Sequence, residues 1–351
     1  MSKWMIYGAN GYTGELAARE AVQRGMTPVL AGRNRQAVEA LAGELGLESR
    51  VFGLDEAESV KRGLRGMFLV LHCAGPFSKT SEPMLEACLA ERVHYLDITG
   101  EINVFEACHA RHAQAREAGV MVLPGTGFDV VPTDCLAAML ARKLPDATSL
   151  VLAFEAGGGP SPGTAKTSVE GLIAGGRVRR DGELREVPLA WKTRTIPFAD
   201  GPRHAMTIPW GDVFTANLST GIPDIEVYLA VPPAVSARLK RMRRFRKLIG
   251  WGPVRRLLMR RVQRRTRGPD SQRREQSESK IWGEVRNASG RTVQGELRTP
   301  NGYDLTVDSS LTIVSQLLEN APTPGFQTPS LLLGPDFVAG LKGVEIYPGF
   351  S

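Results

Sequence analysis

Residues 1–14 read Met1-Ser-Lys-Trp-Met-Ile-Tyr-Gly8-Ala-Asn-Gly11-Tyr-Thr-Gly14, an apolar run that enters a G-x-x-G-x-x-G pattern. An apolar strand that turns through glycines into a helix is typical of a site for the pyrophosphate of a dinucleotide. Gly8 lets the chain turn as it leaves the strand, Gly11 lets phosphates approach the backbone, and Gly14 lets the helix pack close to the strand. The N–H groups and positive dipole end of that helix favour an anion. The opening residues therefore predict a dinucleotide site.

The end of the second apolar strand, Thr27–Ala31, indicates which dinucleotide binds. Gly32-Arg33-Asn34 follows this strand, where an enzyme selective for NAD usually has an acidic residue that accepts from the ribose 2′-hydroxyl. A guanidinium suits a 2′-phosphate through its charge and its paired donors. A surface arginine that happens to follow a strand is the alternative. We predict NADP(H) rather than NAD.

Strands and helices alternate through the first 125 residues, which predicts a Rossmann-type, doubly wound parallel sheet. Asn34 can cap the second helix, whose apolar residues recur at helical spacing. The expected strands are Trp4–Tyr7, Thr27–Ala31, Arg50–Phe52, Phe68–His72, Tyr95–Asp97 and Val120–Leu123.

After about residue 148 the pattern becomes that of antiparallel or mixed β structure. A hairpin is expected about Asp181-Gly182 and another about Asn287–Gly290. The other expected elements are strands at Ser149–Ala156 and Ile225–Val231, and helices at about Leu305–Glu319 and Pro329–Leu341. We predict an NADP-binding domain at 1–147, completed by about 305–351, and an inserted α+β domain at 148–304 that serves the substrate or dimerisation.

Bulk composition narrows the class of protein. The 351 residues suffice for two domains with separate cores. The glycine pattern interrupts the first apolar run, so we expect no secretory leader, and no stretch approaches the roughly 20 apolar residues that span a bilayer. The four cysteines show no C-x-x-C pairing and predict reduced thiols in a cytoplasmic protein. Cys108, His109 and His112 suit a helix surface better than a metal site, so no metal is predicted.

Three loops that follow predicted strands are rich in Gly, Pro, Thr and acidic residues. They are Cys73–Phe77, Asp97–Glu101 and Pro124–Asp134, and ligands of open α/β sheets bind beyond the carboxyl ends of the strands. As alternatives, Asp129 or Asp134 caps the helix near Pro132, and Glu101 caps the helix after it. The predicted cofactor-binding residues are Gly8, Asn10, Gly11, Tyr12, Thr13, Gly14, Arg33, Asn34, Cys73, Ala74, Gly75, Pro76, Thr99, Gly100, Glu101, Gly127, Phe128 and Asp129.

These stretches together resemble the saccharopine dehydrogenase-like oxidoreductase family, which includes the trans-acting enoyl reductases. The similarity covers the first 140 residues well and the remainder sparsely, and it is not specific for a substrate. It implies NADP(H) binding, C-terminal helices that complete the nucleotide domain, and a second domain that often mediates dimers. The matching motifs are Gly8–Gly14, Ala31–Arg33, Gly75–Phe77, Tyr95–Glu101, Gly125–Asp134, Gly163–Thr167 and the helix at Thr328-Pro329.

The catalytic chemistry is less well marked than the cofactor site. Hydride transfer belongs to the nicotinamide, and the protein must hold the acceptor and supply a proton. None of the six tyrosines has a lysine four residues later, which disfavours the mechanism of short-chain dehydrogenases. Lys166, within Gly163-Thr-Ala-Lys-Thr167, is a candidate for contacting a carbonyl or carboxylate, and a solvated lysine at a helix start is the alternative.

The positive charge is concentrated between Arg238 and Arg274, where 16 lysines and arginines accompany one acid, Asp270, although the whole chain carries only +7. Residues 233–268 have the pattern of a basic amphipathic helix broken near Gly250–Pro253. Such a helix suits an anionic membrane surface. An acidic protein partner, a solvated helix and nucleic acid remain alternatives, although no nucleic-acid reader motif is present and we predict no nucleic-acid partner.

The leading hypothesis is an NADPH-dependent reductase of a lipid-like or carrier-bound acyl or enoyl substrate. It would be a homodimer in the cytoplasm and peripheral on the inner face of the membrane. A soluble dehydrogenase of amino-acid-type imines is the first alternative. A membrane-associated adaptor that binds NADP without chemistry is the second.

Overall fold

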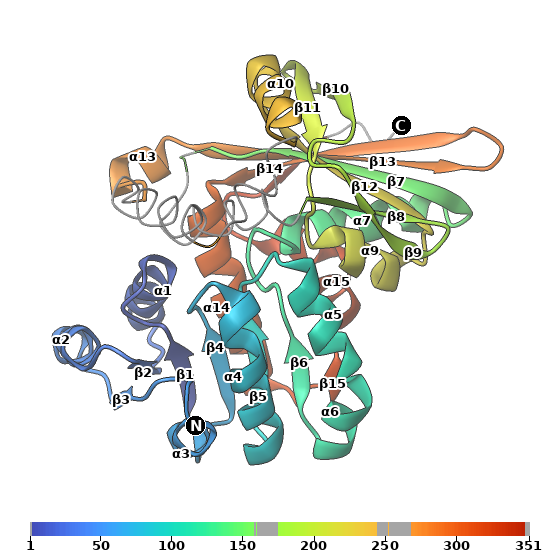
Figure 1. The fold of residues 1–351 in the computed structure, drawn as a ribbon. Helices are drawn as coiled ribbons and strands as arrows, with labels where there is room; N and C mark the ends of the chain where they lie inside the picture. The colour runs from blue at the N-terminus through green and yellow to red at the C-terminus, as the bar shows by residue number, and fades with distance from the viewer. Residues whose placement is uncertain (1, 158, 160–174, 244–251, 253–267, 348–351) are drawn as a thin grey trace. The chain divides into compact units, whose positions relative to one another are not determined.

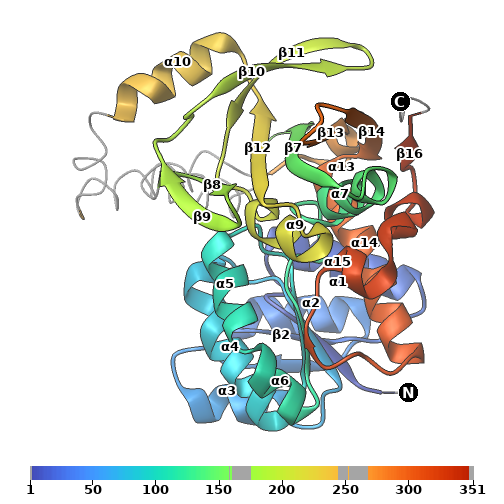
Figure 2. The same cartoon turned by 90° about the vertical axis from the view of Figure 1, so that its right-hand side faces the viewer.

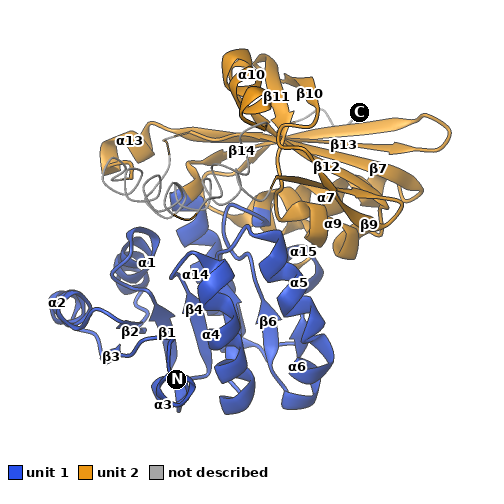
Figure 3. Cartoon of the chain, in the orientation of Figure 1, with its two compact units in different colours: residues 1–131, 303–332 blue, residues 132–302, 333–351 orange. Residues whose placement is uncertain are grey.

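The computed structural model describes residues 2–157, 159, 175–243, 252 and 268–347. The chain forms two compact units, coloured separately in Figure 3: residues 1–131 with 303–332, and residues 132–302 with 333–351. The first unit therefore ends before the predicted boundary at 147. Residues 333–351 belong to the second unit, whereas the sequence suggested that all of 305–351 completes the first.

Unit 1 is built on a parallel sheet. Within the described residues its seven strands lie in the order β15-β6-β5-β4-β1-β2-β3. This order reverses between β1 and β4, as in a doubly wound sheet, so the predicted fold class is confirmed. The strands are β1 (Trp4–Tyr7), β2 (Val29–Gly32), β3 (Ser49–Val51), β4 (Leu69–His72), β5 (His94–Asp97), β6 (Met121–Leu123) and β15 (Gly325–Phe326).

Helices cover both faces of this sheet (Figures 1 and 2). One face carries α1 (Tyr12–Gln23), α2 (Arg35–Leu45) and α14 (Gly302–Glu319), and the other carries α3 (Ala57–Leu64), α4 (Phe77–Glu91), α5 (Ile102–Ala110) and α6 (His112–Ala118). Because both faces are covered, β1, β2, β4, β5 and β6 are buried along their whole length. The predicted helix at about 305–319 is confirmed, and it returns to the nucleotide domain.

Unit 2 contains a mixed sheet of nine strands among the described residues, in the order β10-β11-β12-β7-β13-β14-β16, with β8 joined to β12 and β9 joined to β8. β7 and β12 are parallel, and the other pairs are antiparallel. The strands are β7 (Ala147–Glu155), β8 (Gly176–Arg180), β9 (Glu183–Val187), β10 (Thr193–Phe198), β11 (Gly201–Thr207), β12 (Asp224–Ala230), β13 (Glu278–Asn287), β14 (Thr292–Pro300) and β16 (Glu345–Ile346).

The helices described in unit 2 are α7 (Val131–Lys143), α9 (Asp212–Thr220), α10 (Pro233–Met242) and α13 (Ser271–Glu275). Helix α15 (Pro329–Leu333) belongs to unit 1 except for its last residue. A Cβ placed on Gly283 of β13 would lie 2.7 Å from Leu140 and 3.1 Å from Leu136. This glycine therefore lets α7 pack closely on the sheet.

The sequence located most strands but missed several elements. The hairpin about Asp181-Gly182 is confirmed, because both residues have the positive φ of a tight turn, 52° and 79°. The single helix expected at Pro329–Leu341 is wrong, because Gly334 has φ 83° and separates α15 from a 3₁₀ helix at Pro335–Gly340. β10, β11, β15 and α9 were not predicted.

Candidate cofactor and active site

The glycine turn after β1 has the geometry that a phosphate cradle requires. Gly8 has φ +82°, and its N–H donates to the Ala31 carbonyl at 2.7 Å. A Cβ on Gly14 would lie 2.2 Å from the Gly8 carbonyl oxygen, so α1 can approach the turn this closely only with glycine there. Gly11, the residue that precedes α1, has no side chain with which to cap this helix. A helix start that follows a glycine turn in this way suits an anion.

The adenosine end is marked by Arg33, which follows β2 and is exposed. Its guanidinium forms no ion pair with a carboxylate of the described residues, so it can meet a 2′-phosphate. Asn34 caps α2, as predicted, by accepting from the Ala37 N–H at 3.2 Å. A Cβ on Gly32 would lie 3.0 Å from the Asn10 side-chain oxygen, which places Asn10 beside the end of β2. These residues fit NADP(H).

The loop after β4 lies against the glycine turn. The Cys73 N–H donates to the Tyr7 carbonyl at 2.8 Å, and Ala74 lies 2.8 Å from the position that a Cβ on Gly8 would take. The Gly75–Pro76 peptide is cis. Burial raises the pKa of the Cys73 thiol to about 12, so this cysteine is neutral at physiological pH. The loop thus presents backbone and small uncharged side chains beside the turn.

Glu101 has a structural role that the sequence did not indicate. Its carboxylate accepts from the Phe77 and Ser78 N–H groups, both at 2.9 Å, and so caps the first turn of α4. It does not cap α5, the helix that follows it, so that alternative is wrong. The carboxylate is therefore held at the carboxyl edge of the sheet by the positive end of α4.

Asp97, the last residue of β5, joins two of the predicted loops and was missing from the predicted site. It is fully buried and accepts from the Thr99 and Gly125 N–H groups, each at 2.9 Å, and from the Tyr95 hydroxyl at 2.6 Å. Burial raises its pKa to about 6, although the three hydrogen bonds oppose the shift. A buried acid directly before a Thr-Gly loop was the available signal in the sequence.

Asp129 is the third acidic residue at this edge, and its surroundings differ from those of Asp97 and Glu101. It is half-buried, and no hydrogen bond or ion pair from the described residues holds its carboxylate. It lies directly against Gly100, where a Cβ would be 2.7 Å from Oδ2. Burial and the charge of Glu101 raise the pKa of Asp129 to about 7. A carboxyl group in this state can donate a proton near neutral pH.

Helix α14 holds the loop after β6 in place. Thr306 accepts from the Phe128 N–H at 2.9 Å, and Ser309 donates to the Thr126 carbonyl at 2.7 Å. A Cβ on Gly127 would lie 2.7 Å from Thr306. Sequence reasoning missed these two hydroxyl residues because they lie about 180 positions beyond the loop.

The nucleotide domain is similar in sequence to that of known oxidoreductases. Residues 4–123 match the family model described as the saccharopine dehydrogenase NADP-binding domain. This part of the chain is therefore similar to the NADP-binding domain of that family. The family resemblance and the assignment of NADP(H) as cofactor are thereby confirmed.

Two relatives and one solved structure illustrate the extent of this likeness. A saccharopine dehydrogenase-like oxidoreductase from Bos taurus is 26% identical over 53% of this chain and 50% of its own length. A putative trans-acting enoyl reductase from Mycobacterium tuberculosis is 30% identical over 48% of this chain and 43% of its own. Apo saccharopine dehydrogenase (L-Glu forming) from Saccharomyces cerevisiae has the same fold, with a TM-score of 0.66, 10% identity, and coverage of 99% of this chain and 100% of that one. The chain spans about half the length of the curated relatives that it matches.

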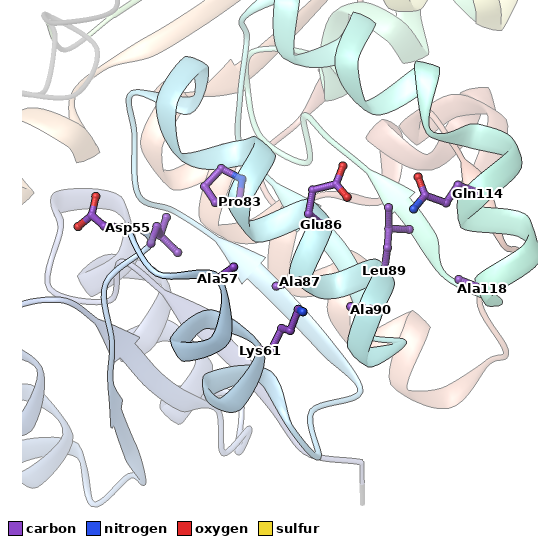
Figure 4. A pocket seen from close by; sticks show the side chains of 11 residues that line it. Asp55, Ala57, Lys61, Pro83, Glu86, Ala87, Leu89, Ala90, Gln114 and Ala118 are labelled. Atoms are coloured by element: carbon purple, nitrogen blue, oxygen red, sulfur yellow. The ribbon is translucent and has the colours of Figure 1, made fainter.

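The NADP-binding domain also has a groove of about 570 Å³ across the outer side of α4 (Figure 4). Ala57 and Lys61 of α3, Ala87 and Ala90 of α4, and Ala118 of α6 contribute to its lining. None of the predicted cofactor-binding residues lines it. The groove is therefore separate from the cofactor site.

Several predicted features lie outside this site. Lys166, the rest of Gly163–Thr167 and most of the basic segment are outside the described residues. Cys108 is buried, and His112 accepts from the Phe326 N–H at 3.1 Å. Over the described ranges, no group of three potential metal ligands is found and no helix is both long and apolar enough to cross a membrane.

Proposed function

We propose that this protein is an NADP(H)-dependent oxidoreductase that reduces a lipid-like or carrier-bound acyl or enoyl substrate. The cofactor site supports the oxidoreductase part of the proposal. The similarity to a putative trans-acting enoyl reductase and the basic segment favour an acyl acceptor over other carbonyl compounds. We assign the role of proton donor to Asp129, because its carboxyl group is half-buried beside the loops at the cofactor edge.

The roles of the protein's own residues follow from the geometry. The α1 N-terminus would hold the pyrophosphate and Arg33 the 2′-phosphate, and the loop after β4 lies beside the glycine turn. Bound NADPH supplies a hydride to the electron-poor carbon of the acceptor. In reduction of a conjugated C=C bond, the neighbouring carbon then takes a proton. The protonated Asp129 donates this proton and becomes a carboxylate, which regains a proton from solvent.

The test of this assignment is the pH profile of NADPH oxidation with trans-2-enoyl thioesters. Because Asp129 must be protonated, turnover should fall as the pH rises through about 7. Asp129→Asn should keep NADPH binding and lose about 10²–10⁴-fold in turnover. Asp55→Asn, which changes an exposed acid in the loop before α3, is the control. An unchanged rate and pH profile in Asp129→Asn would exclude Asp129 as the donor.

A dehydrogenase of amino-acid-type imines is the second candidate, and the curated relatives named saccharopine dehydrogenase-like support it. One comparison distinguishes the two candidates. It sets the rate of NADPH oxidation with enoyl thioesters against the rate with mixtures of a 2-oxo acid and an amino acid. An imine enzyme has no use for the basic segment, so deletion of residues 238–274 should leave its activity unchanged. NADPH binding without turnover of either class would favour the adaptor that binds NADP without chemistry.

We also propose that the basic segment brings the protein to an anionic membrane surface from the cytoplasm and that the protein is a homodimer. The charge of Arg238–Arg274 supports the membrane proposal. Helix α10, which leads into these residues, has an exposed Val235 that could contact the acyl boundary. Flotation with vesicles containing anionic lipid should depend on salt and on residues 238–274. The family resemblance supports the dimer, and light scattering of the full chain tests it.

A further inference from the structure

His72 closes β4 directly below the cofactor edge, and the proposed function gives it no role. Its side chain is fully buried among aromatic rings, with the Tyr7 and Phe77 ring centroids at 5.5 and 5.4 Å. Nε2 lies 3.1 Å from the Thr80 hydroxyl. Nδ1 is buried and has no hydrogen-bond partner among the described residues. A buried imidazole with an unsatisfied nitrogen is costly, so its retention here needs a reason.

The hydrogen bonds around Thr80 fix the direction of this contact. A hydroxyl has one hydrogen to donate. The Thr80 hydroxyl lies 2.6 Å from the Ala74 carbonyl and 3.2 Å from the Pro76 carbonyl, so it donates to Ala74. His72 must then donate to Thr80 through Nε2–H. This leaves Nδ1 as a bare lone pair, in agreement with the burial that lowers the pKa of His72 to about 3 and keeps the ring neutral.

The loop that this pair holds faces the cofactor. Ala74 lies against Gly8 of the glycine turn, at the 2.8 Å approach described above. In the strand order β3-β2-β1-β4, the adenosine end lies at β2 with Arg33, and the turn after β1 lies at the switch point. The loop after β4 therefore lies on the opposite side of the turn from Arg33, where the nicotinamide half of the dinucleotide extends.

We propose that His72 and Thr80 are positioning residues that set the Ala74–Pro76 backbone against the nicotinamide half of NADP(H). The chain of hydrogen bonds runs from His72 to the Thr80 hydroxyl and on to the Ala74 carbonyl. This inference rests on the NADP(H) site and deepens it, because it assigns the two halves of the cofactor to separate structural supports. The adenosine half depends on Arg33, and the nicotinamide half depends on this buried pair.

Calorimetric titration with two probes tests the inference. Adenosine 2′,5′-bisphosphate contains only the adenosine half, and NADPH contains both halves. Thr80→Val and His72→Leu should weaken NADPH binding about ten-fold, as expected for a lost hydrogen bond of about 1.4 kcal/mol, and leave bisphosphate binding within two-fold. Thr80→Ser and His72→Gln keep a hydroxyl and an N–H donor and should restore NADPH binding. The emission of bound NADPH should change in Thr80→Val.

The matched control is His94→Leu. His94 is also buried, but it lies at the start of β5, where it accepts from the Met121 N–H at 3.0 Å. This variant should affect folding stability and leave the ratio of the two affinities unchanged. Equal weakening of both probes in Thr80→Val, or no weakening of either, would overturn the inference. Failure of the unmodified chain to bind the bisphosphate would overturn the NADP(H) site itself, and the inference with it.

Discussion

Asp97 is a buried residue whose carboxyl group joins two of the loops at the cofactor edge, so its replacement should have a large effect. Asp97→Ala removes the acceptor of three buried donors, the Tyr95 hydroxyl and the N–H groups of Thr99 and Gly125. An unsatisfied buried donor costs about 1–3 kcal/mol, so the variant should lose roughly 3–6 kcal/mol of local stability. Asp97→Asn keeps an oxygen for the two N–H groups and should lose only about 1 kcal/mol.

The pH dependence of Asp97→Asn has a definite sign. Burial raises the pKa of Asp97 from 3.8 to about 6, so the folded chain holds this proton more tightly than the unfolded chain. The stability that results is complete below about pH 3.8 and is lost as the pH rises to about 6. The amide does not titrate. The penalty of Asp97→Asn should therefore shrink by roughly 2 kcal/mol between about pH 4.5 and 7.5, and could change sign.

Hydrogen exchange with mass spectrometry is the appropriate assay, because it reports the stability of β5 and the loops after β5 and β6 separately from the second unit. Exchange of these peptides, corrected for the intrinsic effect of pH, is compared in the unmodified chain, Asp97→Asn and the exposed-acid control Asp55→Asn. A difference between Asp97→Asn and the unmodified chain that is the same at both pH values would refute the reasoning.

Three other changes test the site. Arg33→Ala should weaken NADPH about 10–100-fold and leave NADH nearly unchanged, because only NADPH carries the 2′-phosphate; equal losses in titrations would contradict this. Gly14→Ala should abolish NADPH binding, since its Cβ would meet the Gly8 carbonyl. The control Gly43→Ala in α2 places its Cβ in open space and should raise the free energy of unfolding by about 1 kcal/mol. Glu101→Gln should lower the pKa of Asp129, as carboxyl NMR shifts would show, because the Glu101 charge raises it.

Local patterns predicted the nucleotide domain well. Gly8, Gly14 and the Asn34 cap depend on neighbours within a strand–turn–helix unit, so their geometry can be predicted from spacing. Thr306 and Ser309 could not be located in this way, because their partners Phe128 and Thr126 lie about 180 residues earlier in the chain. The second unit was harder for the same reason: the pairing of its strands depends on contacts far apart in sequence, and β10 contains Pro197, which weakens a strand pattern.

The two helix starts on either side of the switch point differ in the residues that precede them. Both α1 and α4 begin at the carboxyl edge, beside β1 and β4, and the positive end of a helix favours an anion. At α4 the Glu101 carboxylate already occupies the first two amides. At α1 the preceding residue is Gly11, which has no side chain with which to cap the helix. Glu101 thus gives the α4 start an anion from the protein itself, and we expect the pyrophosphate at the α1 start.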